Sequence, residues 1–183
     1  MTRSTLFRSF TLATSLAVAA ATGLEAQAPF TVEVSGRGRP MLLIPGLTSG
    51  DVWTATVAQF AKDHEVHVFT LAGFAGVAPI ATDTGWLRLQ RDAIAGYIRE
   101  RRLEKPVIVG HSLGGMLALW IAATHPELPG AVVNVDGMPF FAAVMMPNAS
   151  AEAMRPMATQ MRAQMLSPGA RENYLRMQGA QLK

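Results

Sequence analysis

The stretch Val107-Ile108-Val109-Gly110-His111-Ser112-Leu113-Gly114-Gly115 decides the fold. Its β-branched opening is typical of a strand, and residues 113–123 are apolar nearly all round, as in a helix packed deep against a sheet. Between them, residues 110–114 fit G-x-S-x-G, in which the serine occupies a sharp strand-to-helix turn that exposes its hydroxyl. Such residues can also form an ordinary turn, but the flanking strand and helix favour a catalytic interpretation. Ser112 is the candidate nucleophile, and Gly110, His111 and Gly114 complete its turn.

Strands and helices alternate on both sides of this turn. Apolar runs at 41–44 and 131–135 predict buried strands and residues 66–71 predict another, while 51–62 and 85–102 have the pattern of helices. An alternating strand at 30–34, followed by glycines, predicts a hairpin entry. This order predicts the α/β class, a three-layer α/β/α arrangement with a mostly parallel sheet.

Three segments resemble the α/β-hydrolase family, in its serine-nucleophile branch. They are Ile44-Pro45-Gly46-Leu47, the motif at 110–115 and Val135-Asp136-Gly137, each after a strand. The resemblance covers about residues 30–137. It implies an oxyanion hole formed by the backbone N–H groups of Leu47 and Leu113, which would stabilise charge on a carbonyl oxygen. Some family members place their acid after the strand that precedes Asp136, so this residue is a candidate acid; a carboxylate that merely turns the chain is the alternative.

The general base is not evident in the sequence. Family members present serine, acid and histidine in that order, and among His64, His67, His111 and His125 only the last follows Ser112. A helix rises about 1.5 Å per residue, which would place His125 roughly 20 Å from the hydroxyl. Family members also continue through a cap, further strands and a final histidine loop. We therefore expect a C-terminally incomplete chain that ends in a helical cap segment; a natural short form is the alternative.

Three regions are expected along the chain. Residues 1–28 have the pattern of a signal peptide, with Arg3 and Arg8, an apolar stretch at 12–24, and small residues at Ala26-Gln27-Ala28. Cleavage after Ala28 would give a secreted or periplasmic protein, with an uncleaved membrane anchor as the weaker alternative. Residues 29–137 form the hydrolase core. Residues 138–183 begin a helical cap or lid, with helices expected at 150–166 and 170–178, and hold eight of the eleven methionines.

The composition of the chain limits the kinds of partner and ligand that we expect. A net charge of +3 with only a short basic run near residue 100 does not suggest nucleic-acid binding, and no integral membrane role is expected. The chain has no cysteine, which excludes disulfides, a thiol nucleophile and cysteine metal sites. We expect no cofactor and no metal. The sequence leaves open whether a partner chain or oligomer exists.

The expected function is hydrolysis of a hydrophobic carboxylic ester, thioester or amide. The alternative is a non-catalytic binding or remnant protein with the same fold. The order of elements brings five candidate substrate-binding residues toward the pocket: Gly46, Trp53, Phe74, Met116 and Phe140. The methionines of the last segment suit either an adaptable apolar lid or simple gap filling between helices.

Overall fold

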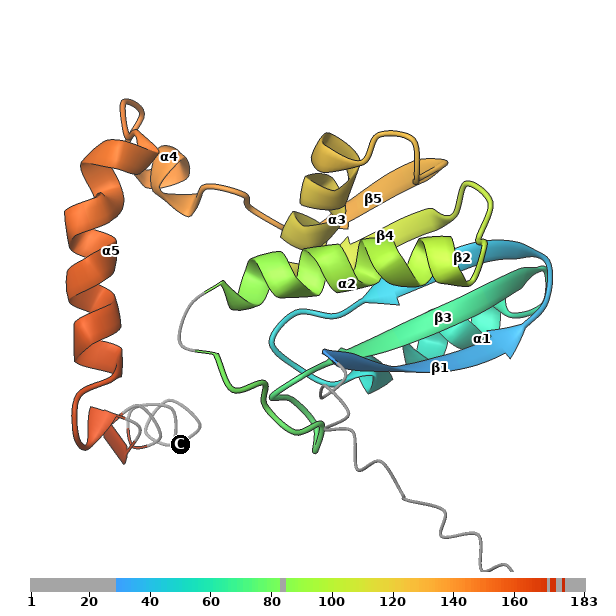
Figure 1. Cartoon of the computed structure of the whole chain (residues 1–183), viewed down its shortest axis with the longest axis horizontal. Helices are drawn as coiled ribbons and strands as arrows, with labels where there is room; N and C mark the ends of the chain where they lie inside the picture. Colours follow the sequence, from blue (N-terminus) through green and yellow to red (C-terminus); the bar gives the residue numbers. More distant parts are fainter. Residues whose placement is uncertain (1–28, 83–84, 171, 174–175, 177–183) are drawn as a thin grey trace, which may run out of the picture.

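The computed structural model describes residues 29–82, 85–170, 172–173 and 176. Within this part, one sheet has the strand order β1-β3-β2-β4-β5 (Figure 1). β1 runs antiparallel to β3, and the other neighbouring pairs are parallel. The strands are β1 (Phe30–Gly36), β2 (Arg39–Ile44), β3 (His64–Leu71), β4 (Val107–His111) and β5 (Ala131–Val135). The predicted α/β class with a mostly parallel sheet is confirmed.

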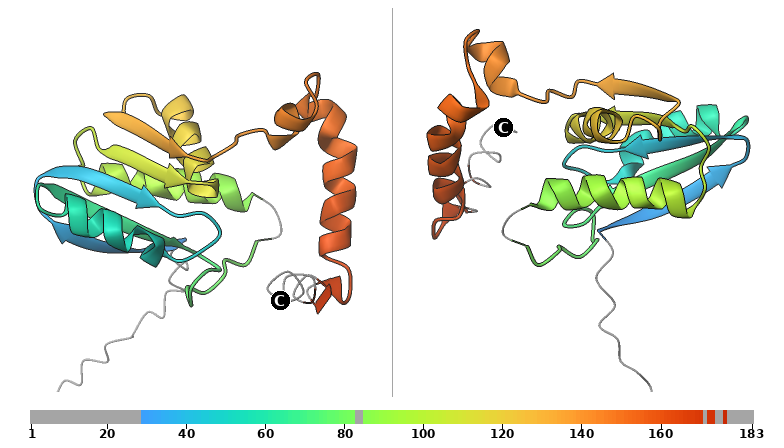
Figure 2. Two further views of the ribbon diagram at one scale, coloured as in Figure 1. Left: turned by 180° about the vertical axis from the view of Figure 1, so that it is seen from behind. Right: turned by 45° about the horizontal axis from the view of Figure 1, so that its top comes forward.

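Helices cover both faces of the sheet, which gives the three predicted layers. A short 3-10 helix η1 (Gly50–Trp53) leads into α1 (Thr54–Phe60) on one face. The other face carries α2 (Trp86–Glu100) and α3 (Leu113–Thr124), and Figure 2 shows this division from two further sides. The helix expected at 51–62 is thus split into two shorter pieces.

Each face has its own hydrophobic core. On the α2 and α3 face, residues such as Leu42, Phe69 and Leu117 are fully buried. On the α1 face, Leu43 and Val66 pack with Trp53, which is only 8% exposed. Because alternate strand residues point to opposite faces, the continuous apolar runs of β2 and β3 supply both cores. Trp53 therefore belongs to the core beneath α1.

Two strand predictions were wrong. Residues 30–34 do not form a hairpin with β2, because β3 lies between the two strands and pairs with both. β5 was expected to be buried, yet Val133 is 46% and Val135 41% exposed. β5 is the last strand of the described sheet, paired with β4 alone, so one long edge lacks a partner strand there. An apolar run alone does not distinguish a central strand from an edge strand.

The segment after β5 leaves the sheet. A connection leads to α4 (Phe141–Met145), which the sequence reading missed, and then to α5 (Ala151–Met165). Both helices lie to one side of the three layers in every view (Figures 1 and 2), and α5 has no buried residue. The helix expected at 150–166 is confirmed, whereas the one at 170–178 falls largely outside the described residues, as does the predicted signal peptide. The division of the chain at 137 remains a prediction.

No helix in the described ranges is both long enough and apolar enough to span a bilayer.

Candidate active site

The strand-to-helix turn expected at residues 110–114 is present. β4 ends at His111, and Ser112 has φ 53° and ψ −115° before α3 begins. A positive φ at a residue other than glycine stores strain of about 1–3 kcal/mol, which persists only where the surroundings impose it. Two backbone bonds do so here: the Ser112 N–H donates to the Val135 carbonyl at 2.8 Å, and the Met116 N–H donates to the Ser112 carbonyl at 3.1 Å. The strained residue is also exposed, so its hydroxyl is accessible.

Small residues around Ser112 are required by the closeness of neighbouring backbone. A Cβ at Gly110 would lie 2.1 Å from the Gly114 carbonyl oxygen, and a Cβ at Gly114 would lie 2.1 Å from the Ile44 carbonyl oxygen. No side chain tolerates such contacts with backbone. The glycines of the motif therefore hold the start of α3 against the end of β2.

The loop after β2 lies against the serine. Gly46 is buried, and a Cβ there would lie 3.1 Å from the Ser112 Cβ and 3.6 Å from its Oγ. The next residue, Leu47, is 67% exposed, and Leu113 on the other side of the serine packs partly into the core. The carboxyl ends of parallel strands meet at one sheet edge, so the loop at 45–47 and the first turn of α3 flank the same hydroxyl. The helix N-terminus adds a partial positive charge there.

Asp136 lies at the same edge, directly after β5. It is exposed and has a φ of 54°. No described histidine forms a hydrogen bond with it. The neighbouring backbone is nevertheless close to the serine, because the carbonyl of Val135 accepts the bond from Ser112. The structure thus brings Asp136 to the serine's end of the sheet without a base for it to orient.

Asn134 is a positioning residue that the sequence reading missed. Its side-chain amide donates to the Gly137 carbonyl at 2.7 Å, and its Oδ1 accepts from the Gly137 N–H at 3.0 Å. A Cβ at Gly115 would lie 2.1 Å from the same Oδ1. Asn134 therefore fixes the turn after β5 against the first turn of α3. A polar residue inside an apolar strand was the signal that could have revealed it.

A comparison with known proteins agrees with this geometry. The profile described as "Alpha/beta hydrolase family" matches residues 41–180, a range that includes the loop after β2, the Ser112 turn and Asp136. The chain belongs to the alpha/beta hydrolase family.

Several relatives of this chain are esterases. It is 32% identical over 118 residues to a pimeloyl-[acyl-carrier protein] methyl ester esterase of Aeromonas hydrophila, covering 62% of this chain and 43% of that protein. A thermophilic esterase from Thermogutta terrifontis is 26% identical with a TM-score of 0.52, over 56% of this chain and 38% of the other. A structure from a study of carboxylesterases of Nitrososphaera gargenis is 20% identical with a TM-score of 0.59, over 76% of this chain and 50% of the other. At this identity the likeness establishes the fold alone. The chain spans less than half the length of the curated relative.

Three of the four histidines have other hydrogen-bond or ion-pair partners. The Nδ1 of His67 lies 2.8 Å from the Tyr97 hydroxyl in the core, and the Nδ1 of His64 lies 2.8 Å from a carboxylate oxygen of Asp63. His125 follows the last turn of α3, where its Nδ1 lies 3.1 Å from the Arg99 guanidinium. His111 is the residue before the serine. No described histidine forms a hydrogen bond with Ser112.

The candidate substrate-binding residues lie in different places. Leu47 and Phe74 line one cavity of about 370 Å³ beside the loop after β2, and the Phe74 ring lies 6.2 Å from that of Trp86. Met116 lines an apolar groove of about 410 Å³ with Trp120 on the outer side of α3. Phe140 lines a third groove between α4 and α5. Of this set, Gly46 and Phe74 are the ones at the loop beside Ser112.

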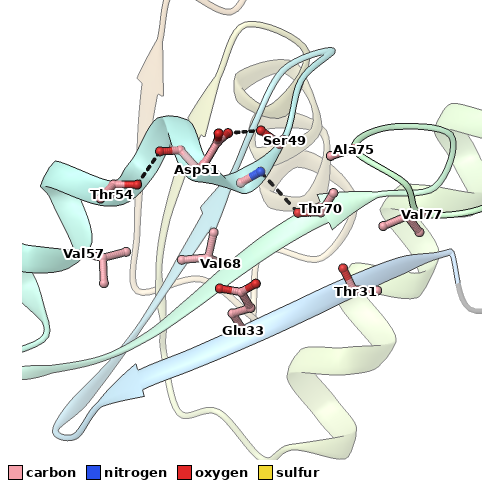
Figure 3. Close-up of a pocket in the computed structure, with 11 residues that line it drawn as sticks. Thr31, Glu33, Ser49, Asp51, Thr54, Val57, Val68, Thr70, Ala75 and Val77 are labelled. Atoms are coloured by element: carbon pink, nitrogen blue, oxygen red, sulfur yellow. Dashed lines mark hydrogen bonds between the residues drawn. The ribbon is translucent and has the colours of Figure 1, made fainter.

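A fourth groove, of about 610 Å³, lies at the far side of the sheet between β1, β3 and η1 (Figure 3). It is polar: the Ser49 hydroxyl donates to the Asp51 carboxylate, the Gly50 N–H donates to the Thr70 hydroxyl, and Glu33 points toward the space. The Ser49, Asp51 and Thr70 side chains bond to one another or to backbone, and the groove does not include Ser112. It is not part of the candidate site around Ser112.

Within the described ranges, no group of three or more histidine, cysteine, aspartate or glutamate side chains is arranged to hold a metal ion.

Proposed function

We propose that this chain is the front part of a secreted serine hydrolase that cleaves a small carboxylic ester, thioester or amide. The conformation of Ser112 is the observation that carries the proposal. A strained, exposed serine between a parallel strand and a buried helix matches the nucleophile turn of the family, which presents the hydroxyl to a substrate. Strain of this kind is concentrated at functional sites, which supports a catalytic role for Ser112.

The proposed chemistry is acyl transfer. The Ser112 oxygen attacks the substrate carbonyl carbon and loses its proton to a base, while the carbonyl oxygen becomes negatively charged. The backbone N–H groups of Leu47 and Leu113 would donate to that oxygen, since they flank the hydroxyl from two sides. The leaving alcohol, thiol or amine takes the proton back from the base. Water then repeats the sequence and releases the acid.

The substrate class follows from the cavity beside Leu47. Its wall is mostly apolar, with Phe74, Ile80 and Trp86 among the residues that line it, so it suits the hydrocarbon part of an ester. The Aeromonas relative is named as an esterase of a methyl ester. We propose an ester of a small alcohol as the first substrate to assay.

The general base is proposed to come from polypeptide beyond these 183 residues, because each histidine of the chain has another position. A histidine delivered from there could also pair with Asp136. The competing function is a non-catalytic binding protein that keeps the serine turn, and the same experiment separates the two.

Chemical rescue tests the proposal. The folded chain is treated with a fluorophosphonate probe with and without added imidazole, which can act as the missing base. We expect imidazole to accelerate formation of a covalent adduct at Ser112, located by peptide mass, and Ser112→Ala to abolish it. Ser167→Ala, which removes another exposed hydroxyl, is the matched control and should label normally. A folded sample that never labels at Ser112 would favour the binding protein, and fast labelling without imidazole would place the base inside the chain.

Export is a separate proposal, based on the pattern of residues 1–28 alone. Expression of the gene in a bacterial host should yield an exported protein whose first residue is Pro29, as read by intact mass. An uncleaved protein retained in the membrane fraction would show that this segment is an anchor.

A further inference from the structure

The groove between α4 and α5 is lined mainly by methionine. It has a volume of about 560 Å³ and six of its ten lining residues are methionines. The six are Met138, Met145, Met146, Met154, Met157 and Met161. They come from three consecutive segments: the connection after β5, the end of α4, and α5. The clustering of methionines in the sequence is therefore also a clustering in space.

The α5 contribution is aligned on one side of the helix. Met154, Met157 and Met161 are spaced three and four residues apart, which at 3.6 residues per turn places them within roughly 60° of arc. Met165 continues the same side by a further turn but does not line the groove, and it is 72% exposed. Three thioethers thus project from one helix face toward those of the other two segments.

Apolar packing alone does not require methionine at these positions. Leucine has a similar helix propensity and nearly the same volume, yet leucine, isoleucine and valine are absent from the groove lining. The two cores on the faces of the sheet instead contain many leucines and isoleucines, with Met41 as a buried methionine. The groove methionines also stay accessible, with Met145 at 67% and Met161 at 55%. Methionine differs from leucine in its flexibility, which suits an adaptable apolar cover, and in its sulfur atom, which can bind a soft cation.

We propose that this groove binds a soft monovalent metal ion, Cu(I), through methionine thioethers. Thioether sulfur selects soft cations such as Cu(I) over hard ones. The ligands carry no charge, so a monovalent ion leaves less uncompensated charge in an apolar groove than a divalent ion would. The chain has no cysteine that could compete for the ion. The site is independent of the Ser112 chemistry.

The first test uses Ag(I), which is equally soft and does not change oxidation state. The full chain, labelled with ¹³C in the methionine methyl groups, is titrated in chloride-free buffer and followed by NMR. We expect the methyl signals of the groove methionines to shift up to one ion per chain. Those of Met41 in the core and Met165 outside the groove should not move. Equal shifts at Met165 and at the groove would reveal unspecific binding to exposed thioethers and overturn the proposal.

Substitution supplies the second test. A variant with Met154, Met157 and Met161 all replaced by leucine keeps the apolarity, volume and helix propensity of the groove. Loss of an outer-shell partner alone weakens metal affinity by about 10–100-fold. Removal of three direct ligands should therefore weaken Cu(I) binding, measured by competition with a chromophoric Cu(I) chelator under reducing conditions, by more than about 100-fold. Met165→Leu is the matched control and should bind as the parent does.

Two outcomes of the substitution would overturn the proposal. Unchanged Cu(I) affinity in the triple leucine variant would assign the metal to other ligands, such as the histidines. Binding of a fatty acid probe that is equally strong in the parent and the triple variant, with no metal binding by either, would make the groove a site for apolar ligands.

Discussion

The layered core and the C-terminal helices of this chain are stabilised in different ways. In the core, strands β2 and β3 supply fully buried side chains to both faces, and α3 fits against β4 through glycines with no space for a Cβ. In α5 no residue is buried, and three of its four methionines are 50–72% exposed. Its described support is local, through the side chain of Ser150 at its N-terminus. The core is held by long-range packing and α5 by its own turns.

The two modes of stabilisation leave different patterns in the amino-acid sequence. Long-range packing leaves a strong pattern, because every buried position must be apolar and every close approach must be glycine. A helix supported locally is constrained only by propensity and capping. Substitutions should therefore have large effects in the core and small ones in α5, and the predictions below probe that contrast in order of expected size.

The largest effect is expected from Gly114→Val. Any Cβ at this position meets the Ile44 carbonyl oxygen at 2.1 Å and the Pro45 carbonyl oxygen at 2.6 Å. Backbone cannot move aside without separating α3 from β2, so we expect a loss of more than about 4 kcal/mol in the free energy of unfolding. Chemical denaturation followed by circular dichroism measures it. Gly96→Ala, in a helix with nothing within 4 Å of the added Cβ, should be neutral or stabilising; equal damage at both sites would disprove the steric argument.

The next effect compares one side chain from each region. Leu117 of α3 is fully buried, so Leu117→Ala should lower the free energy of unfolding by about 2–5 kcal/mol through lost burial and a residual cavity. Met161→Ala in α5 removes a similar side chain that is 55% exposed and should cost under about 0.5 kcal/mol. Both are measured by the same denaturation curves. A Met161→Ala cost comparable to that of Leu117→Ala would show that α5 packs on the core in solution.

The same contrast explains how much the sequence could predict. The buried runs of β2 and β4 and the Gly110–Gly114 turn were recognisable because packing and steric exclusion each leave a distinct residue pattern. The sheet neighbours of β1 and the exposure of β5 were not, because strand order and edge position depend on the whole sheet. The break between η1 and α1 at Trp53 was also invisible, since local propensity does not separate a 3-10 turn from the start of a helix.

The residues of the candidate site were likewise only partly predictable from the sequence. Ser112 and the neighbouring Gly46 loop were found because both need special backbone geometry. Asn134 was missed because its two hydrogen bonds to Gly137 become visible only once the turn is folded. Met116 was expected at the pocket from the order of the elements, but its side chain lines a separate groove with Leu87 of α2 and Trp120 of α3.

A titratable group buried in the core should make stability depend on pH. His67 is 1% exposed, with Nδ1 2.8 Å from the Tyr97 hydroxyl and Nε2 2.9 Å from a Glu65 carboxylate oxygen. Burial lowers the pKa of His67 below its ordinary value of 6.5, an effect that Arg101 supports and the Glu65 carboxylate only partly offsets. Below about pH 6.5 the unfolded chain therefore takes up a proton that the folded chain resists.

The free energy of unfolding should accordingly fall as the pH drops from 7.5 to 5.5, by at most about 1.4 kcal/mol per pH unit from this one group. His67→Asn, which can still bond to the Tyr97 hydroxyl, should remove that contribution and flatten the curve. Denaturation at a series of pH values measures both slopes. Identical slopes for the two proteins would mean that His67 binds protons equally in the folded and unfolded chains, so that burial does not lower its pKa.

A smaller and local effect is expected at the start of α5. The Ser150 hydroxyl accepts a hydrogen bond from the Ala153 N–H at 3.1 Å, and Glu152 lies in the first turn. Because Pro156 inside the helix has no N–H to donate, this cap is a large share of the local stability. Ser150→Ala should cost about 1 kcal/mol, visible as roughly fivefold faster hydrogen exchange of α5 amides with no change in those of α3. Thr159→Ala, whose hydroxyl only bonds back to the Arg155 carbonyl, should leave exchange unchanged or slow it. If Ser150→Ala instead accelerated exchange in α3, the two regions would unfold together, and the stability of α5 would depend on the core.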